Sequence, residues 1–125
     1  MGWQRKVHTM LKSYYTFILK NGRQLRDHVG KPGGVIFNNK LVIKVRSSVH
    51  MLKSPPAWAI DSSTLQEARE SGVTVVILLE QENEVIYCAP ISQFRKHGQL
   101  IDRHPGNRIL LPLEYWKVTT QLEML

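Results

Sequence analysis

The sequence predicts an α+β fold, a single small domain with a mostly antiparallel sheet of two or three hairpins and two to four short helices. Three observations indicate this. Apolar runs flank the turn-forming pair Asn38-Asn39, two further apolar runs occupy 73–79 and 85–89, and helix-capping residues precede 63–71. A chain of 125 residues, of which 42% are hydrophobic, is long enough for one core. We therefore expect residues 1–125 to form one domain.

The N-terminal segment has a pattern that fits both a helix and a strand. Apolar residues recur there at spacings of three and four, which is typical of one face of a helix. The part from Tyr14 onward, however, is dense in aromatic and β-branched residues and ends at Asn21-Gly22, which favours a strand running into a turn. We predict a helix over 3–12 and a strand over 14–19.

A second short helix is predicted over 22–29. It would turn Leu25 and Val29 inward and would end at Gly30, a residue that readily terminates helices.

A hairpin is predicted next, with strands 35–37 and 41–46 joined by Asn38-Asn39, because asparagine tolerates the positive φ of a two-residue turn. Pairing through this turn gives the hairpin two unlike faces. One face carries the apolar residues Ile36, Leu41, Ile43 and Val45. The other is half apolar and half cationic, with Val35, Phe37, Lys40, Val42, Lys44 and Arg46.

The next elements are a brief strand over 57–60 and a helix over 63–71. Asp61, Ser62 and Ser63 offer side-chain oxygens for the N-cap of this helix, and Gly72 ends it. The run 73–79 is apolar at every position but one, which indicates a central strand buried on both faces. Residues 85–89 are its hairpin partner.

The remaining elements are short. Ser92 can cap a helical turn that runs to His97 and closes at Gly98, and 104–107 forms a turn between strands 100–101 and 109–111. Residues 113–118 form either a last strand or a short helix.

The charges divide unequally along the chain. A basic half, residues 1–56, contains eleven Lys or Arg and a single acid, whereas the mildly acidic half, residues 57–125, contains six against nine. A clustered positive field attracts polyanions. The cations, Lys12 among them, are spread over several predicted elements rather than one run, which favours a folded basic surface over a disordered arm.

We therefore expect a non-catalytic domain that contacts the nucleic-acid backbone without strong sequence specificity, as an accessory component or modulator of a nucleoprotein complex. DNA and RNA both remain open as the nucleic acid. The predicted binding residues are Arg23, Arg26, Lys31, Lys40, Lys44 and Arg46, with Phe37, or Tyr14 or Tyr15, as a platform for base stacking. The chain contains no signature of a helix-turn-helix, RNA-recognition motif or phosphate loop.

The alternative is a protein-interaction adaptor or inhibitor. The C-terminal segment is rich in residues that anchor interfaces, and Leu113, Tyr115 and Trp116 are its candidate contacts to a partner protein or a second copy of the chain. The same residues could instead pack on the chain's own core.

A more distant alternative is a metal-dependent nuclease using Asp61, Glu80 and Glu82, because such enzymes hold Mg²⁺ with carboxylates on adjacent strands. Asp61 is more simply explained as a helix cap, and the two glutamates as part of a solvated turn. The five histidines are scattered, apart from a local cluster of His97, Asp102 and His104. We expect no metal site, no cofactor and no catalytic residue.

The single cysteine, Cys88, excludes an internal disulfide and is predicted to be a small buried hydrophobe. No apolar run approaches the length of a transmembrane helix, so we expect no membrane partner and a cytoplasmic location.

Overall fold

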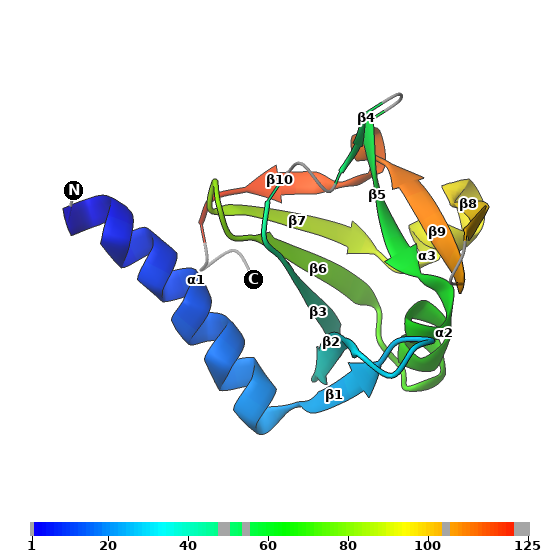
Figure 1. Cartoon of the computed structure of the whole chain (residues 1–125), viewed down its shortest axis with the longest axis horizontal. Coiled ribbons are helices and arrows are strands. Elements are labelled where there is room, and N and C mark those ends of the chain that lie inside the picture. Colours follow the sequence, from blue (N-terminus) through cyan, green and yellow to red (C-terminus); the bar gives the residue numbers. More distant parts are fainter. Residues whose placement is uncertain (1, 48–50, 54–55, 104–105, 122–125) are drawn as a thin grey trace.

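A six-stranded and a four-stranded sheet form the framework of the molecule (Figure 1). The computed structural model describes residues 2–47, 51–53, 56–103 and 106–121. The strands of the larger sheet follow the order β1 (Arg23–Arg26), β2 (Pro32–Phe37), β3 (Lys40–Val45), β6 (Val75–Glu80), β7 (Val85–Pro90) and β10 (Lys117–Thr119). Those of the smaller sheet follow the order β4 (Leu52–Lys53), β5 (Pro56–Asp61), β9 (Gly106–Pro112) and β8 (Gln99–Arg103). Neighbouring strands are antiparallel except for β3 and β6, which confirms the predicted α+β class.

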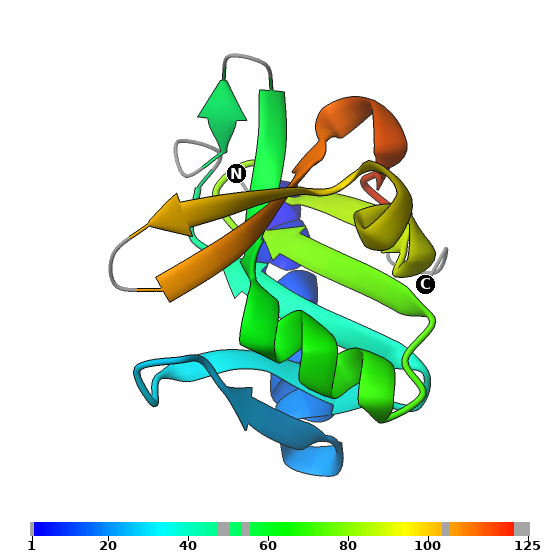
Figure 2. The same cartoon turned by 90° about the vertical axis from the view of Figure 1, so that its right-hand side faces the viewer.

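Helices cover both faces of the larger sheet. The long helix α1 (Gly2–Asn21) lies on one face, and α2 (Ser62–Glu70) lies on the other together with the smaller sheet (Figure 2). A short helix, α3 (Ser92–His97), follows β7. Within the described residues, no helix combines the length and apolar character needed to span a bilayer.

The central strand β6 is buried on both faces, as predicted. Ile77 and Leu79 pack toward α1, whereas Val76 and Leu78 belong to the larger cluster that includes α2 and the smaller sheet. All four side chains are at most 1% exposed. A strand that is covered on both faces needs apolar residues at successive positions rather than at every second one.

The predicted strand over 14–19 is wrong, because these residues continue α1 to Asn21. The buried side of the helix carries Leu11, Tyr14, Tyr15 and Ile18, a helical spacing that brings all four onto the sheet. Packing of this apolar stripe outweighs the strand propensity of the aromatic residues.

The predicted helix over 22–29 is also wrong. Residues Arg23–Arg26 form strand β1, and a turn with Gly30 at φ 84° follows. Leu25 points into the core as predicted, but it does so as the one buried residue of an edge strand, and Val29 is 49% exposed. Residues Arg23–Arg26 form a strand because their backbone hydrogen-bonds to β2. The local sequence does not reveal this partner.

The hairpin β2–β3 has the predicted turn and the predicted faces. Asn38 adopts φ 55°, and Phe37 and Val35 pair with Lys40 and Val42, respectively. Leu41 therefore faces the larger cluster, whereas Val42 and Phe37 face α1.

The remaining predictions are mostly confirmed, with three refinements. Helix α2 has Asp61 as its N-cap, and α3 follows Ile91 with no side-chain cap, so the predicted Ser92 cap is wrong. Strands β8 and β9 pair as expected, although residues 104–105 of the predicted turn lie outside the described residues and Gly106 already belongs to β9. The last segment contains both alternatives, a 3₁₀ helix η2 (Leu113–Tyr115) and then β10.

Candidate functional site

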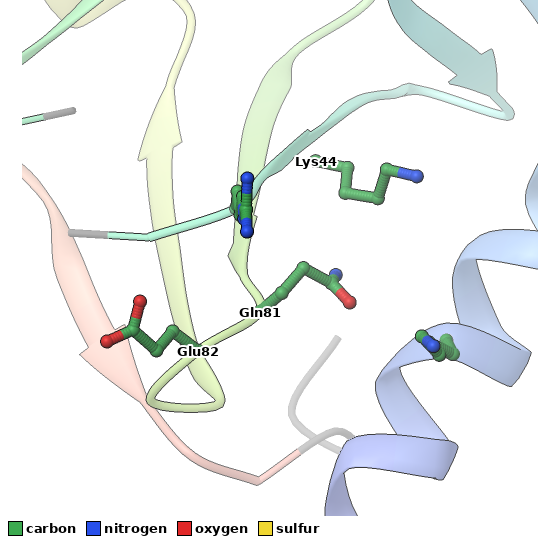
Figure 3. Close-up of a pocket in the computed structure, with 5 residues that line it drawn as sticks. Lys44, Gln81 and Glu82 are labelled. Carbon is green, nitrogen blue, oxygen red and sulfur yellow. The ribbon is translucent and has the colours of Figure 1, made fainter. Parts of the chain in front are cut away.

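A groove of about 540 Å³ opens between α1 and the adjacent ends of β3 and β6 (Figure 3). Its described lining consists of Lys12 from α1, Lys44 from β3, Arg46 directly after β3, and Gln81 and Glu82 directly after β6. We refer to these five residues as the cationic groove. Three of its five side chains are basic and one is acidic.

The parallel pairing of β3 and β6 builds one wall of this groove. Val45 and Glu80 are partners in the register, so both strands end at the same edge of the sheet. Beyond them, the backbone N–H groups of Gln81 and Glu82 donate to the carbonyl oxygens of Val45 and Arg46, each at 3.0 Å. The two segments are thus fixed side by side, and α1 forms the opposite wall.

The charges of the groove are not neutralised by one another. In the described part of the chain, the side chains of Lys12, Arg46 and Glu82 have neither a hydrogen bond nor an ion pair. The Lys44 ammonium lies 5.0 Å from the ring centre of Tyr15, an interaction that leaves its charge intact. Figure 3 shows Lys44 extending toward α1, with Glu82 pointing away from it.

The Tyr15 side chain beside Lys44 is a neutral phenol. Burial raises the pKa of the Tyr15 hydroxyl above its usual value, so the ring carries no charge at neutral pH. Its π face is therefore the attractive surface for the ammonium.

The predicted basic residues do not all share one surface. Lys44 and Arg46 lie in the cationic groove, and Lys40 is on the same face of β3 but about 13 Å along the strand from Lys44. Arg23 pairs across the sheet with Ile36 and therefore faces the opposite side, where it bonds to Glu67 at 2.8 Å and Ser71 at 2.7 Å.

Two other predicted cations lie apart from the groove. Arg26 donates to the carbonyl of Gly30 at 3.1 Å, and Lys31 is exposed in the same turn. Conversely, Lys12 is a groove residue that was not among the predicted binding residues. A helix that continues past residue 12 brings Lys12 next to Tyr15, three residues on, which packs on the sheet, so this placement could have been inferred from the helical spacing.

Phe37 is half-buried and does not stand alone. Its ring meets that of Phe17 edge to face, with 5.5 Å between the centroids, and Phe17 is 52% exposed. The pair lies on the α1 side of the sheet, as the hairpin register requires.

The proposed nuclease carboxylates are not brought together. Glu80 is fully buried rather than solvated, and it accepts hydrogen bonds from the backbone N–H of Asn83 at 2.5 Å and from its side chain at 2.7 Å. Asp61 caps α2. Among the described residues, no three His, Cys, Asp or Glu side chains form a group that could hold a metal ion. The nuclease hypothesis receives no support.

Asp61 instead forms a buried polar junction. One carboxylate oxygen lies 2.6 Å from Nδ1 of His28, and the other accepts from the Ser63 hydroxyl and from the backbone N–H of Thr64 at 3.0 Å. Burial alone would raise the pKa of Asp61, but the hydrogen bonds from Ser63, His28 and Thr64 outweigh it and lower this pKa below its usual value. The junction ties the turn after β1 to the start of α2.

Asn is itself a good N-cap residue, so replacing Asp61 with Asn keeps the cap and removes the charge. This change should lower the free energy of unfolding by about 1 kcal/mol at pH 7, because hydrogen bonds to a charged acceptor are stronger than those to a neutral one. Because the folded-state pKa of Asp61 is depressed, its stabilising effect is present above the unfolded pKa of about 3.9 and is lost as pH falls through the folded pKa. Urea unfolding at pH 7 and at stepwise lower pH should therefore show the two proteins converging in acid. A difference that is equal at every pH would contradict this role.

The other candidate residues have structural partners. His97 stacks on Tyr115, with 4.1 Å between ring centres, and burial raises the pKa of the half-buried Cys88 thiol, which disfavours a reactive thiolate. The side chain of Asp102 and residue His104 lie outside the described residues.

The predicted interface residues pack largely on the chain itself. Trp116 is 5% exposed and its indole N–H donates to the carbonyl of Leu111 at 3.1 Å, so Trp116 is a core residue. Leu113 and Tyr115 are half-buried against the same cluster. Within the described part of this segment, up to residue 121, the adaptor hypothesis therefore finds no exposed aromatic anchor.

No protein family model matches the chain, and no curated protein and no solved structure is significantly similar to it.

Proposed function

We propose that this protein binds the backbone of a nucleic acid through the cationic groove, without catalysis, as an accessory component of a nucleoprotein complex. The observation that carries the proposal is the convergence on one groove of Lys12 from α1 with Lys44 and Arg46 from β3 and the residue after it, with none of the three charges paired among the described residues. Cations that form no ion pair with a carboxylate of the described residues favour a polyanionic ligand.

Three unpaired cations in one groove are better explained by the binding of an anionic ligand than by a role in stabilising the fold. Like charges that line one groove repel one another, and surface ion pairs would relieve this repulsion, as Glu67 does for Arg23. Phosphates would relieve it more strongly, because each neutralised phosphate releases condensed counterions into solution. The groove lies between two packed walls, so the backbone positions of its cations are set before binding.

Salt dependence tests the proposal. With three phosphate contacts, the logarithm of the association constant should fall with the logarithm of salt concentration with a slope of about −2 for a single strand. Fluorescence anisotropy with labelled oligonucleotides, DNA and RNA in parallel, would measure it between low and moderate salt. A slope near zero, or no binding to either nucleic acid at low salt, would refute the proposal.

A further inference from the structure

Glu82 is the exception in the cationic groove. It is an exposed carboxylate on a surface that we propose binds phosphates, and it should repel them. It could neutralise a neighbouring cation, yet its side chain has no ion pair or hydrogen bond in the described part of the chain. In Figure 3 the Glu82 side chain points away from Lys44 and from α1. The groove therefore has a cationic side and a separate rim that accepts hydrogen bonds.

The backbone of Glu82 is held in place, so the carboxylate always starts from the same point on the rim of the groove. Its backbone N–H donates to the carbonyl of Arg46 at 3.0 Å, next to the Gln81–Val45 bond. The buried carboxylate of Glu80 further holds the turn by accepting from Asn83. Glu82 is thus presented by a constrained segment rather than by a loose loop.

A nucleotide has the complementary chemistry. Its phosphate is anionic, and its base, unless it is thymine or uracil, carries an exocyclic amino group at the other end. A carboxylate accepts a hydrogen bond from such a group, as Glu does from N4 of cytosine. We propose that Glu82 is a specificity-determining residue that selects amino-bearing bases in a single strand whose phosphates lie near Lys12, Lys44 and Arg46. This inference rests on the proposed function.

The shape of the groove favours a single strand over a duplex. Its cations lie on facing walls, Lys12 on α1 and Lys44 on β3, so a phosphate must enter between them. A volume of about 540 Å³ accommodates a nucleotide or two rather than a double helix. In an unpaired strand the amino-bearing edge of the base is also free to reach Glu82.

Oligo(dC) and oligo(dT) of equal length separate phosphate binding from recognition of the amino group. Both are pyrimidine strands, and only cytosine carries an amino group. The wild-type protein should bind oligo(dC) about tenfold more tightly than oligo(dT), and either strand more tightly than a duplex of the same length. Glu82→Ala should remove this preference, partly by strengthening oligo(dT) binding as the repulsive charge is lost. Glu82→Gln, which retains an acceptor oxygen, should restore part of the preference.

Glu114→Ala provides the matched control, because Glu114 is exposed and lies outside the groove. It should leave both affinities and their ratio unchanged. If Glu82→Ala strengthens binding of both oligonucleotides by the same factor, Glu82 only repels phosphate and the specificity inference is overturned, while backbone binding stands. Equal wild-type affinity for the two strands, or tighter binding of the duplex, would also overturn it. If the association constant of the wild-type protein did not depend on salt concentration, the proposed function itself would be refuted.

Discussion

Replacing Lys44 and Arg46 together with Glu is expected to weaken oligonucleotide binding by at least about 100-fold at 0.1 M salt. Both cations lie in the cationic groove, and reversing them would remove two of the proposed phosphate contacts and add two repulsive charges beside Glu82. Anisotropy titrations with the same oligonucleotide would measure the change. The slope of the salt dependence should become shallower by about 0.7 for each lost contact.

The fold should survive these changes. Both side chains are exposed, and the one described interaction lost is that of Lys44 with the Tyr15 ring, at a cost of about 0.5–1 kcal/mol. Arg95→Glu with Lys96→Glu is the matched control, because it reverses one arginine and one lysine on the exposed side of α3, at the other end of the molecule from α1 (Figure 1). If both double variants lose affinity equally, binding follows net charge and the groove has no special role.

The sequence predicts this fold well wherever local chemistry and tertiary environment agree. The turn at Asn38-Asn39, the two-sided strand and the capped helix after Asp61 each depend on residues close in sequence. All three occur, the strand predicted over 73–79 as Val75–Glu80. Prediction fails at 14–19 and 22–29. In these two segments, the choice between strand and helix depends on which part of the protein covers the apolar side chains. That part comes from residues distant in sequence.

The candidate site is predicted only in part, for a related reason. Alternation along β3 places Lys44 and Arg46 on one face, and the hairpin turn is enough to establish it. Bringing Gln81 and Glu82 beside them requires the parallel pairing of β3 with β6, which are separated by β4, β5 and α2. Adding Lys12 requires the packing of α1 on the sheet. A charge pattern thus identifies the cations but not which of them converge, and Arg23, on the opposite face, shows the difference.

Trp116→Ala is expected to destabilise the protein by about 3–5 kcal/mol, a large part of the stability of a domain of this size. The indole is 5% exposed and meets two aromatic rings nearly perpendicularly, Phe94 at 5.5 Å and Tyr87 at 6.5 Å between centroids. The substitution would leave a cavity where β7, α3 and the C-terminal segment meet, and it would leave the Leu111 carbonyl without its indole donor. Urea unfolding followed by circular dichroism would measure the loss.

The same variant separates a core role for Trp116 from an interface role. Trp116→Phe should retain most of the packing and lose less stability, and Val118→Ala, at a position 52% exposed on the neighbouring strand, should change stability by no more than about 0.5 kcal/mol. Size-exclusion chromatography under native conditions completes the test, because a core residue should alter stability without altering assembly. An unchanged unfolding midpoint with a later elution would instead place Trp116 between two copies of the chain, and would restore the protein-interaction hypothesis.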